Sequence, residues 1–137
     1  MPEKYYLDTS IWIDYYENRS DNFRPLGDWA HKLLSLIDCN KDVLLISSLL
    51  MEELELHFSQ KEVCSMLEPY KEIMTTIKVN QNQLAEARQK AKERDIPKAD
   101  ALHAIIARDN NAILITRDHH FEKLIDITRS CKPEELI

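Results

Sequence analysis

Short apolar runs alternate with longer helical segments along nearly the whole chain, and this alternation constrains the fold most. The predicted strands are 5–7, 43–46, 77–79 and 112–115, with an edge strand at 125–128. Apolar residues at helical spacing predict helices at 11–16, 26–37, from 48 onward, 62–74, 81–94, 98–108 and 120–124. Strands that alternate with helices in this way favour parallel pairing through crossover connections. The sequence therefore predicts an α/β fold, a three-layer α/β/α sandwich with a central, mostly parallel sheet.

The chain of 137 residues has the length of a single domain, which we expect to span residues 1–137. No apolar leader follows Met1, and the longest apolar-rich run, 43–51, is far shorter than the roughly 20 residues of a membrane span. Its three cysteines are widely spaced, which argues against a disulfide framework or a cysteine-rich zinc site. We therefore expect a cytoplasmic protein that does not enter a membrane.

Two features of composition limit the possible chemistry. Gly27 is the only glycine, which excludes both the P-loop and the glycine-rich dinucleotide-binding fingerprint. The net charge of −6 argues against a basic protein that coats nucleic acid. Any chemistry on phosphate groups must therefore rely on another device.

Acidic residues stand where a parallel sheet would bring them together. Asp8 follows the first predicted strand, and Asp118 closely follows the strand at 112–115. Ligands of such sheets bind beyond the carboxyl ends of the strands. Asp100 lies in the first turn of a helix that is apolar nearly all round, and the helix dipole explains tolerance of the charge but not its choice over a neutral residue.

A fourth carboxylate comes from Glu52 or Glu53. Glu52 lies on a polar stripe that we expect to face solvent, whereas Glu53 shares a stripe with Leu49 and Leu56. This periodicity favours Glu53 as the inward-facing residue, while the sequence leaves the choice between the two open.

Four converging carboxylates would need a compensating cation or bound protons. Two such charges about 4 Å apart repel by roughly 4 kcal/mol at an effective dielectric constant of 20. Ligand sets made only of oxygen favour Mg²⁺ or Mn²⁺. A bound divalent ion activates water and orients a phosphodiester, and it would replace the missing glycine-rich phosphate cradle.

Four segments, in this order, resemble the motifs of the PIN domain family, the fold of metal-dependent ribonucleases that includes VapC-like toxins. They are LDTS at 7–10, SSLLMEEL at 47–54, IPKADALHA at 96–104 and ITRDHHF at 115–121. The third segment is the closest match, and the second again selects Glu53, because the family's glutamate precedes a leucine. Each segment alone is weak evidence, but four at compatible spacing are specific.

The resemblance implies a Mg²⁺- or Mn²⁺-dependent endoribonuclease that leaves a 5′ phosphate and a 3′ hydroxyl. It implies that Asp8, Glu53, Asp100 and Asp118 are metal ligands and catalytic groups. Ser10 and Thr116 resemble the hydroxyl residues that hydrogen-bond within the acidic site, whereas Thr9 is a weaker candidate. The resemblance also implies a toxin of a toxin–antitoxin pair, with a protein antitoxin as partner and a homodimeric assembly.

Other polar residues near these motifs are harder to assign. Lys98 and Arg117 flank two of the acidic motifs and are the best candidates for contacts with RNA phosphates. We interpret His103 as a neutral packing histidine, and His119 and His120 as part of a solvated helix start.

Two other functions compete with the nuclease. A PIN-like module that binds RNA or protein without cleaving it is the main alternative, although the full acidic set argues against it. A phosphatase of the haloacid-dehalogenase type also has an aspartate after its first strand. That family has a second aspartate two residues later, where this chain has Ser10.

Overall fold

The computed structural model describes residues 2–137, and its centre is a sheet of five parallel strands in the order β3-β2-β1-β4-β5. The strands are β1 (Lys4–Leu7), β2 (Val43–Ser47), β3 (Met74–Ile77), β4 (Ile113–Ile115) and β5 (Ser130–Cys131). The α-helices are α1 (Thr9–Glu17), α2 (Leu26–Cys39), α3 (Ser48–His57), α4 (Gln60–Leu67), α5 (Gln81–Arg94) and α6 (Lys98–Asp109). Three short 3₁₀ helices complete the described chain: η1 (Glu68–Ile73), η2 (His119–Leu124) and η3 (Pro133–Glu135).

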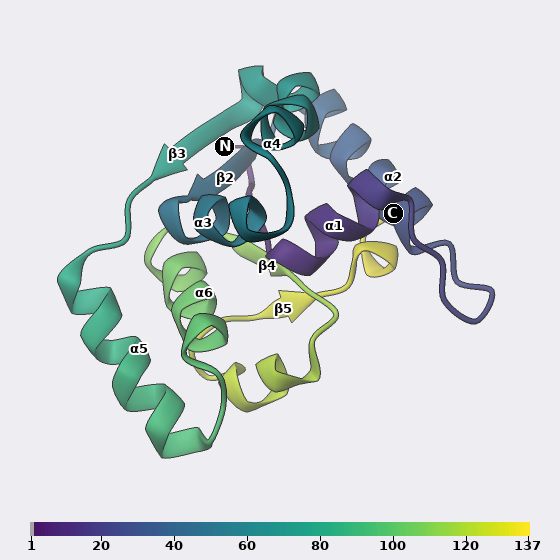
Figure 1. Cartoon of the computed structure of the whole chain (residues 1–137). Coiled ribbons are helices and arrows are strands. Elements are labelled where there is room, and N and C mark those ends of the chain that lie inside the picture. The colour runs from purple at the N-terminus through teal and green to yellow at the C-terminus, as the bar shows by residue number, and fades with distance from the viewer. Residues whose placement is uncertain (1) are drawn as a thin grey trace.

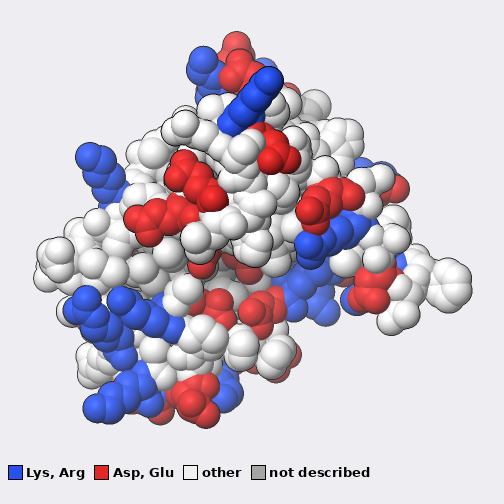
Figure 2. Space-filling view, viewed as in Figure 1, with Lys and Arg blue, Asp and Glu red and all other residues white. Residues whose placement is uncertain are grey.

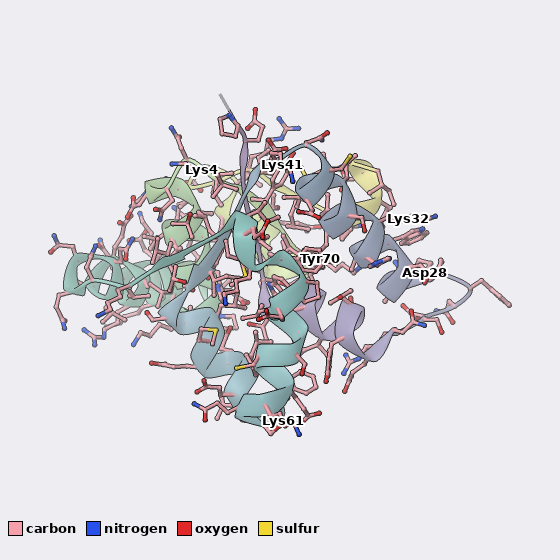
Figure 3. All side chains as sticks on the ribbon, turned by 90° about the horizontal axis from the view of Figure 1, so that it is seen from above. Lys4, Asp28, Lys32, Lys41, Lys61 and Tyr70 are labelled. Atoms are coloured by element: carbon pink, nitrogen blue, oxygen red, sulfur yellow. The ribbon has the colours of Figure 1, made fainter. Side chains whose placement is uncertain are left out.

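Helices cover both faces of the sheet, which confirms the predicted three-layer α/β/α sandwich. The pair α5 and α6 lies on one side, and the pair α1 and α2 lies on the other (Figure 1). The central strands β2 and β4 are buried beyond their first residue, and β1 is buried at Tyr6 and Leu7, as expected for apolar strands covered on two faces. The amphipathic helix α2 shows the same division, because Asp28 and Lys32 lie on its outer surface (Figure 3) while Leu33 and Leu34 are buried.

The strand order reverses beside β1, and this reversal creates a crevice. From β1 the chain moves to β2 and β3 on one side, then returns to β4 on the other side of β1. Leu7 at the end of β1 is in register with Ile115 at the end of β4. Open parallel sheets bind their ligands outside the carboxyl ends of strands at such a switch point. The residues that follow β1 and β4 are therefore the first place to look for a site.

The predicted helix at 62–74 and the strand at 77–79 are wrong in their boundaries. The α-helix ends at Leu67, a 3₁₀ helix that begins with Glu68 and Pro69 follows, and β3 already starts at Met74. Proline lacks the N–H that a continuing α-helix would use. The true start of this strand was not predicted, because β3 lies at the edge of the sheet and exposes Thr75 and Thr76.

The predicted edge strand at 125–128 is also wrong. The backbone N–H groups of Ile127 and Thr128 both donate to the carbonyl of Leu124, so this segment forms a turn after η2. The last strand is β5, and the carbonyl of Cys131 accepts the N–H of Thr116 at 2.9 Å beside the end of β4.

Most helix starts follow the expected capping chemistry. Ser47 caps α3, and Asn80 with Gln83 forms a capping box at the start of α5. Across residues 2–137, no helix combines the length and the apolar character that crossing a membrane requires. The three cysteines are free, and only Cys131 is buried.

Candidate functional site

A cavity of about 320 Å³ lies beyond the carboxyl ends of β1 and β4. It is lined by Asp8, Thr9, Ser10, Ile13, Glu53, Leu56, His57, Asp100, His103 and Asp118. All four carboxylates expected from the sequence therefore meet in one place, although they come from four separate segments. The space-filling view shows acidic side chains in the hollow near the centre of this face (Figure 2).

Asp8 is the most deeply placed of the four carboxylates, with 5% of its surface exposed. Ser10 Oγ donates to its Oδ1 at 2.7 Å, and Thr116 Oγ1 donates to its Oδ2. Burial raises the pKa of Asp8 above its ordinary value, although these hydrogen bonds act in the opposite direction. Ser10 and Thr116 thus form hydrogen bonds within the acidic site, as the family resemblance implies, and both bind Asp8.

Thr9 and Ser10 are of residue types that commonly cap helices, but Asp8 itself is the N-cap of α1. Its carboxylate accepts the N–H of Ile11 at 3.3 Å. The two hydroxyl residues turn instead toward carboxylates of the cavity, Ser10 toward Asp8 and Thr9 toward Glu53. One side chain therefore both starts the helix and lines the site.

Glu53 enters the cavity from α3, while its neighbour Glu52 does not. Glu52 is exposed and lines a separate groove of about 420 Å³ between α3, α5 and α6. Glu53 Oε1 accepts a hydrogen bond from Thr9 Oγ1, and it lies 2.6 Å from His103 Nε2. Burial opposes ionisation of Glu53, but the interactions with His103 and Thr9 outweigh it and lower the pKa of Glu53 below its ordinary value.

Asp100 and Asp118 face each other across a histidine. His120 Nδ1 lies 2.9 Å from Asp100 Oδ2 and 3.0 Å from Asp118 Oδ1. Neither contact has hydrogen-bond geometry, so the buried atoms Asp100 Oδ2 and His120 Nδ1 both lack a hydrogen-bond partner among residues 2–137. Burial and the nearby charge of Asp118 raise the pKa of Asp100. Both histidines were expected at a solvated helix start. His119 is indeed 80% exposed, but His120 lies beside two carboxylates of the site.

Three of the four carboxylates stand at helix N-termini. Asp8 caps α1, Asp118 caps η2, and Asp100 lies in the first turn of α6. The partial positive charge of these ends favours a nearby anion by about 0.3–1 kcal/mol each. This offset is smaller than the mutual repulsion of several carboxylates, so the arrangement still favours a bound cation.

The two basic residues expected to contact RNA do not line the acidic cavity. Lys98 lies at the separate groove with Glu52. Arg117 forms a paired contact with Glu134 at 2.6 and 2.9 Å, and its guanidinium lies 5.5 Å from the centre of the Trp29 ring. Its Nε is 3.8 Å from Asp14, so Arg117 ties the C-terminal segment to α1 and α2.

Sequence reasoning undervalued two groups that touch the site, Thr9 and His103. Both contact Glu53, which lies more than 40 residues from each in the chain. Thr9 follows Asp8 directly, and His103 stands one helical turn beyond Asp100, so adjacency to the motifs was the available signal.

The donor set fits a hard divalent cation. The four carboxylates offer oxygen ligands, and the unsatisfied Asp100 Oδ2 is an acceptor without a protein donor in the described chain. Nitrogen is also available, since ligand atoms of Asp118, His119 and His120 lie within 4.8 Å of one another. Asp8, Glu53, Asp100 and Asp118 are thus the residues suited to hold such an ion.

These features define an all-parallel α/β sandwich with an acidic cavity at its topological switch point. Comparison with protein families places the chain within that class: the PIN domain model matches residues 5–126. The chain belongs to the PIN domain family, which confirms the resemblance read from its motifs. None of the curated protein sequences matches the chain at a significant level.

Solved structures share the fold over nearly the whole chain. VapBC2 from Rickettsia felis, bound to a DNA fragment from its promoter, has 24% identity and a TM-score of 0.67, covering 94% of this chain and 98% of that one. VapBC-1 from nontypeable Haemophilus influenzae has 20% identity and a TM-score of 0.67, with 96% and 98% coverage. A toxin-antitoxin complex from Klebsiella pneumoniae has 17% identity and a TM-score of 0.64, with 94% and 97% coverage.

Proposed function

We propose that this protein is a Mg²⁺- or Mn²⁺-dependent endoribonuclease that hydrolyses phosphodiester bonds of RNA. The observation that carries the proposal is the convergence of Asp8, Glu53, Asp100 and Asp118 on one cavity. Four segments spread over 110 residues would not be expected to bring four carboxylates together, against their repulsion, without a cation to bind. Membership of the PIN domain family supports the same chemistry.

The chain's own residues hold the site in a fixed shape. Ser10 and Thr116 donate to Asp8, and Thr9 and His103 hold Glu53, so these two carboxylates keep their orientation when RNA enters. Asp100 and Asp118 contribute the remaining oxygens. A divalent ion bound there supplies an activated water and neutralises charge on the phosphodiester.

The solved neighbours support a toxin of a toxin–antitoxin pair as the biological role, since several are VapBC or toxin-antitoxin complexes. We propose a protein antitoxin as partner, a homodimeric assembly and a cytoplasmic location. Light scattering on the purified chain tests the homodimer. A dimer mass supports the proposal, and a monomer at high concentration contradicts it.

A cleavage assay on a mixture of structured and unstructured RNAs tests the activity. We expect cleavage with MgCl₂ or MnCl₂, none after EDTA, and recovery when metal is restored. Asp8→Asn and Asp100→Asn should each lower the cleavage rate by at least a hundredfold, because each removes a negative charge from the site. Losses of this size are usual when an enzyme loses a group that stabilises charge in the transition state.

Asp28→Asn is the matched control, because Asp28 also lies in the first turn of a helix but is exposed on α2. It should cleave like the wild type. Unchanged cleavage by both site variants would contradict the assignment of the site. RNA that is bound by the wild type but never cut would favour the alternative, a non-catalytic PIN-like binding module.

A further inference from the structure

A buried row of hydrogen bonds leads from the end of β2 to the acidic cavity. Ser47 Oγ lies 2.6 Å from the hydroxyl of Tyr6, and that hydroxyl lies 2.6 Å from His103 Nδ1. The other ring nitrogen, His103 Nε2, lies 2.6 Å from Glu53 Oε1. Ser47 and Tyr6 have no exposed surface, and His103 has 3%. Water therefore does not compete for these contacts.

The donors and acceptors of this row match in only one direction when Glu53 is ionised and the His103 ring is neutral. A carboxylate only accepts, so His103 Nε2 must carry the hydrogen that faces Glu53. In the neutral ring, Nδ1 then accepts the hydroxyl hydrogen of Tyr6, whose oxygen accepts that of Ser47. Ser47 Oγ in turn accepts the N–H of Leu50 at 3.0 Å. Every hydrogen of the row is used once.

The row ends on one oxygen of Glu53 and spares the other. His103 Nε2 and Thr9 Oγ1 both reach Oε1. Within residues 2–137, Oε2 receives no hydrogen bond, and so it is free to take a ligand. A carboxylate held by one oxygen in this way presents the other in a fixed place, as the outer partners of metal ligands do elsewhere.

Packing alone does not explain a histidine at this position. The neighbouring residues of α6, Leu102, Ala104 and Ile105, are buried and apolar, whereas His103 is a buried polar residue among them. Burying a hydroxyl and an imidazole in a row costs stability that apolar side chains would not. The row is satisfied only because each member has its partner.

We propose that His103 is a positioning residue, fixed in one tautomer by Tyr6 and Ser47, that orients Glu53 for the divalent cation. This inference rests on the proposed function, because it gives His103 a role toward the ion of that nuclease. His103 touches neither ion nor RNA in this role, and acts through Glu53.

Binding of Mn²⁺ to the full-length protein, followed by the loss of the electron paramagnetic resonance signal of the free ion, tests the role without requiring cleavage. His103→Leu should weaken Mn²⁺ binding by about 10–100-fold, the usual cost of losing an outer partner of a metal ligand. His103→Gln, which keeps an N–H toward Glu53, should bind within about threefold of the wild type. Tyr6→Phe, which frees the tautomer, should fall between the two.

Tyr70→Phe is the matched control for Tyr6→Phe. Tyr70 is also a buried tyrosine, but it packs on Trp12 and Tyr15 and does not line the cavity, so its variant should bind Mn²⁺ like the wild type. Nitrogen-15 resonances of the metal-free protein should show His103 with its hydrogen on Nε2, and a mixture of tautomers in Tyr6→Phe.

Three outcomes would overturn the inference. The first is a folded His103→Leu variant that binds Mn²⁺ as the wild type does. The second is a His103 ring with its hydrogen on Nδ1, and the third is a Tyr70→Phe variant that weakens binding as much as Tyr6→Phe. Failure of the proposed function has a different signature, because the wild type itself would then bind no Mn²⁺ while its histidine resonances still showed the row intact.

Discussion

Asp100 carries a charge where the fold disfavours one. Its side chain is 16% exposed, its Oδ2 lacks a donor, and burial and the charge of Asp118 raise its pKa. A group of this kind binds protons more readily in the folded chain than in the unfolded one, so its ionisation at neutral pH lowers stability. Groups that oppose stability in this way are characteristic of functional sites.

Asp100→Asn should therefore stabilise the metal-free protein and abolish its response to metal. We expect the melting temperature in EDTA to rise by a few degrees, as about 1 kcal/mol does in a domain of this size. We expect MnCl₂ to raise the melting temperature of the wild type but not that of the variant, because binding to the folded state stabilises it. Calorimetry at pH 7.5 measures both. A variant that melts lower in EDTA would contradict this account. Asp28→Asn should not raise the melting temperature in EDTA, and it should keep the response to MnCl₂.

Gly27 occupies a position that has no room for a side chain. A Cβ atom there would stand 2.5 Å from Cα and 2.8 Å from the carbonyl carbon of Asn18, which are backbone atoms that cannot rotate away. Gly27→Ala should lower the free energy of unfolding by about 1–3 kcal/mol, the range for overpacking a tight site. Urea unfolding measures it. Helix propensity alone predicts a gain of up to about 1 kcal/mol, so a stabilised variant would show that no clash exists.

At the residue scale, sequence reasoning found the groups that stand beside strands and motifs. Asp8, Asp100 and Asp118 follow from position, and periodicity separated Glu53 from Glu52. It missed the partnership of Tyr6 and His103, because residues 97 apart meet only in the folded sheet and leave no local pattern.

The helices α5 and α6 are joined by an ion pair near the solvent. Arg108 makes two contacts with Glu86, at 2.6 and 2.7 Å, and Gln83 donates to Asp109 beside it. The hydrogen bond from Arg108 lowers the pKa of Glu86 below its ordinary value of 4.5. Because α6 carries Asp100, this contact helps to fix the position of the helix that bears one carboxylate of the site.

Glu86→Gln should lower the free energy of unfolding by about 0.5 kcal/mol at pH 7, since the pair is partly exposed. A lowered carboxyl pKa contributes stability above the unfolded-state pKa, and that contribution disappears as the pH falls through the folded-state pKa. The difference between the two proteins should therefore vanish in acid, below pH 4.5. Urea unfolding across pH 3–7 measures it.

Glu93→Gln on the same helix is the control, because Glu93 only approaches Lys90 at 3.8 Å. It should show no measurable loss at any pH. A difference between Glu86→Gln and wild type that persists unchanged in acid would mean that the pair does not act through its charge.

Elements were easiest to predict where local chemistry marks their ends. Asn80 with Gln83 set the start of α5, and its range in the structure equals the predicted one. The edge strands β3 and β5 were misplaced because one exposes its threonines and the other has only two residues. Neither carries the apolar run by which buried strands are recognised.

Several basic side chains gather on one helix near the acidic hollow. In the same view, Lys and Arg side chains lie over α5, at the lower left (Figure 2). Arg88 and Lys92 are exposed there, one helical turn apart, and Lys98 begins the next helix. In the proposed function, a protein with a net charge of −6 would depend on such local basic residues to approach RNA.

Replacing both Arg88 and Lys92 by alanine should raise the KM for single-stranded RNA and leave kcat nearly unchanged. Each lost phosphate contact should reduce the slope of log affinity against log salt by about 0.7. Cleavage measured from 50 to 250 mM KCl tests this. Lys4→Ala with Lys32→Ala is the control, because Lys32 lies on α2 and Lys4 begins β1 at the end opposite Asp8. Equal salt slopes for the two double variants would contradict the assignment.

The central position of β1 also sets when the molecule can become active during its synthesis. Thr116 Oγ1 holds Asp8 across 108 residues, and β4 joins β1 near the end of the chain. At the usual 5–20 residues per second, Asp8 waits about 5–20 s on the ribosome for that partner. A translation product broken off earlier lacks Asp118 as well, so an unfinished copy cannot assemble the four-carboxylate cavity.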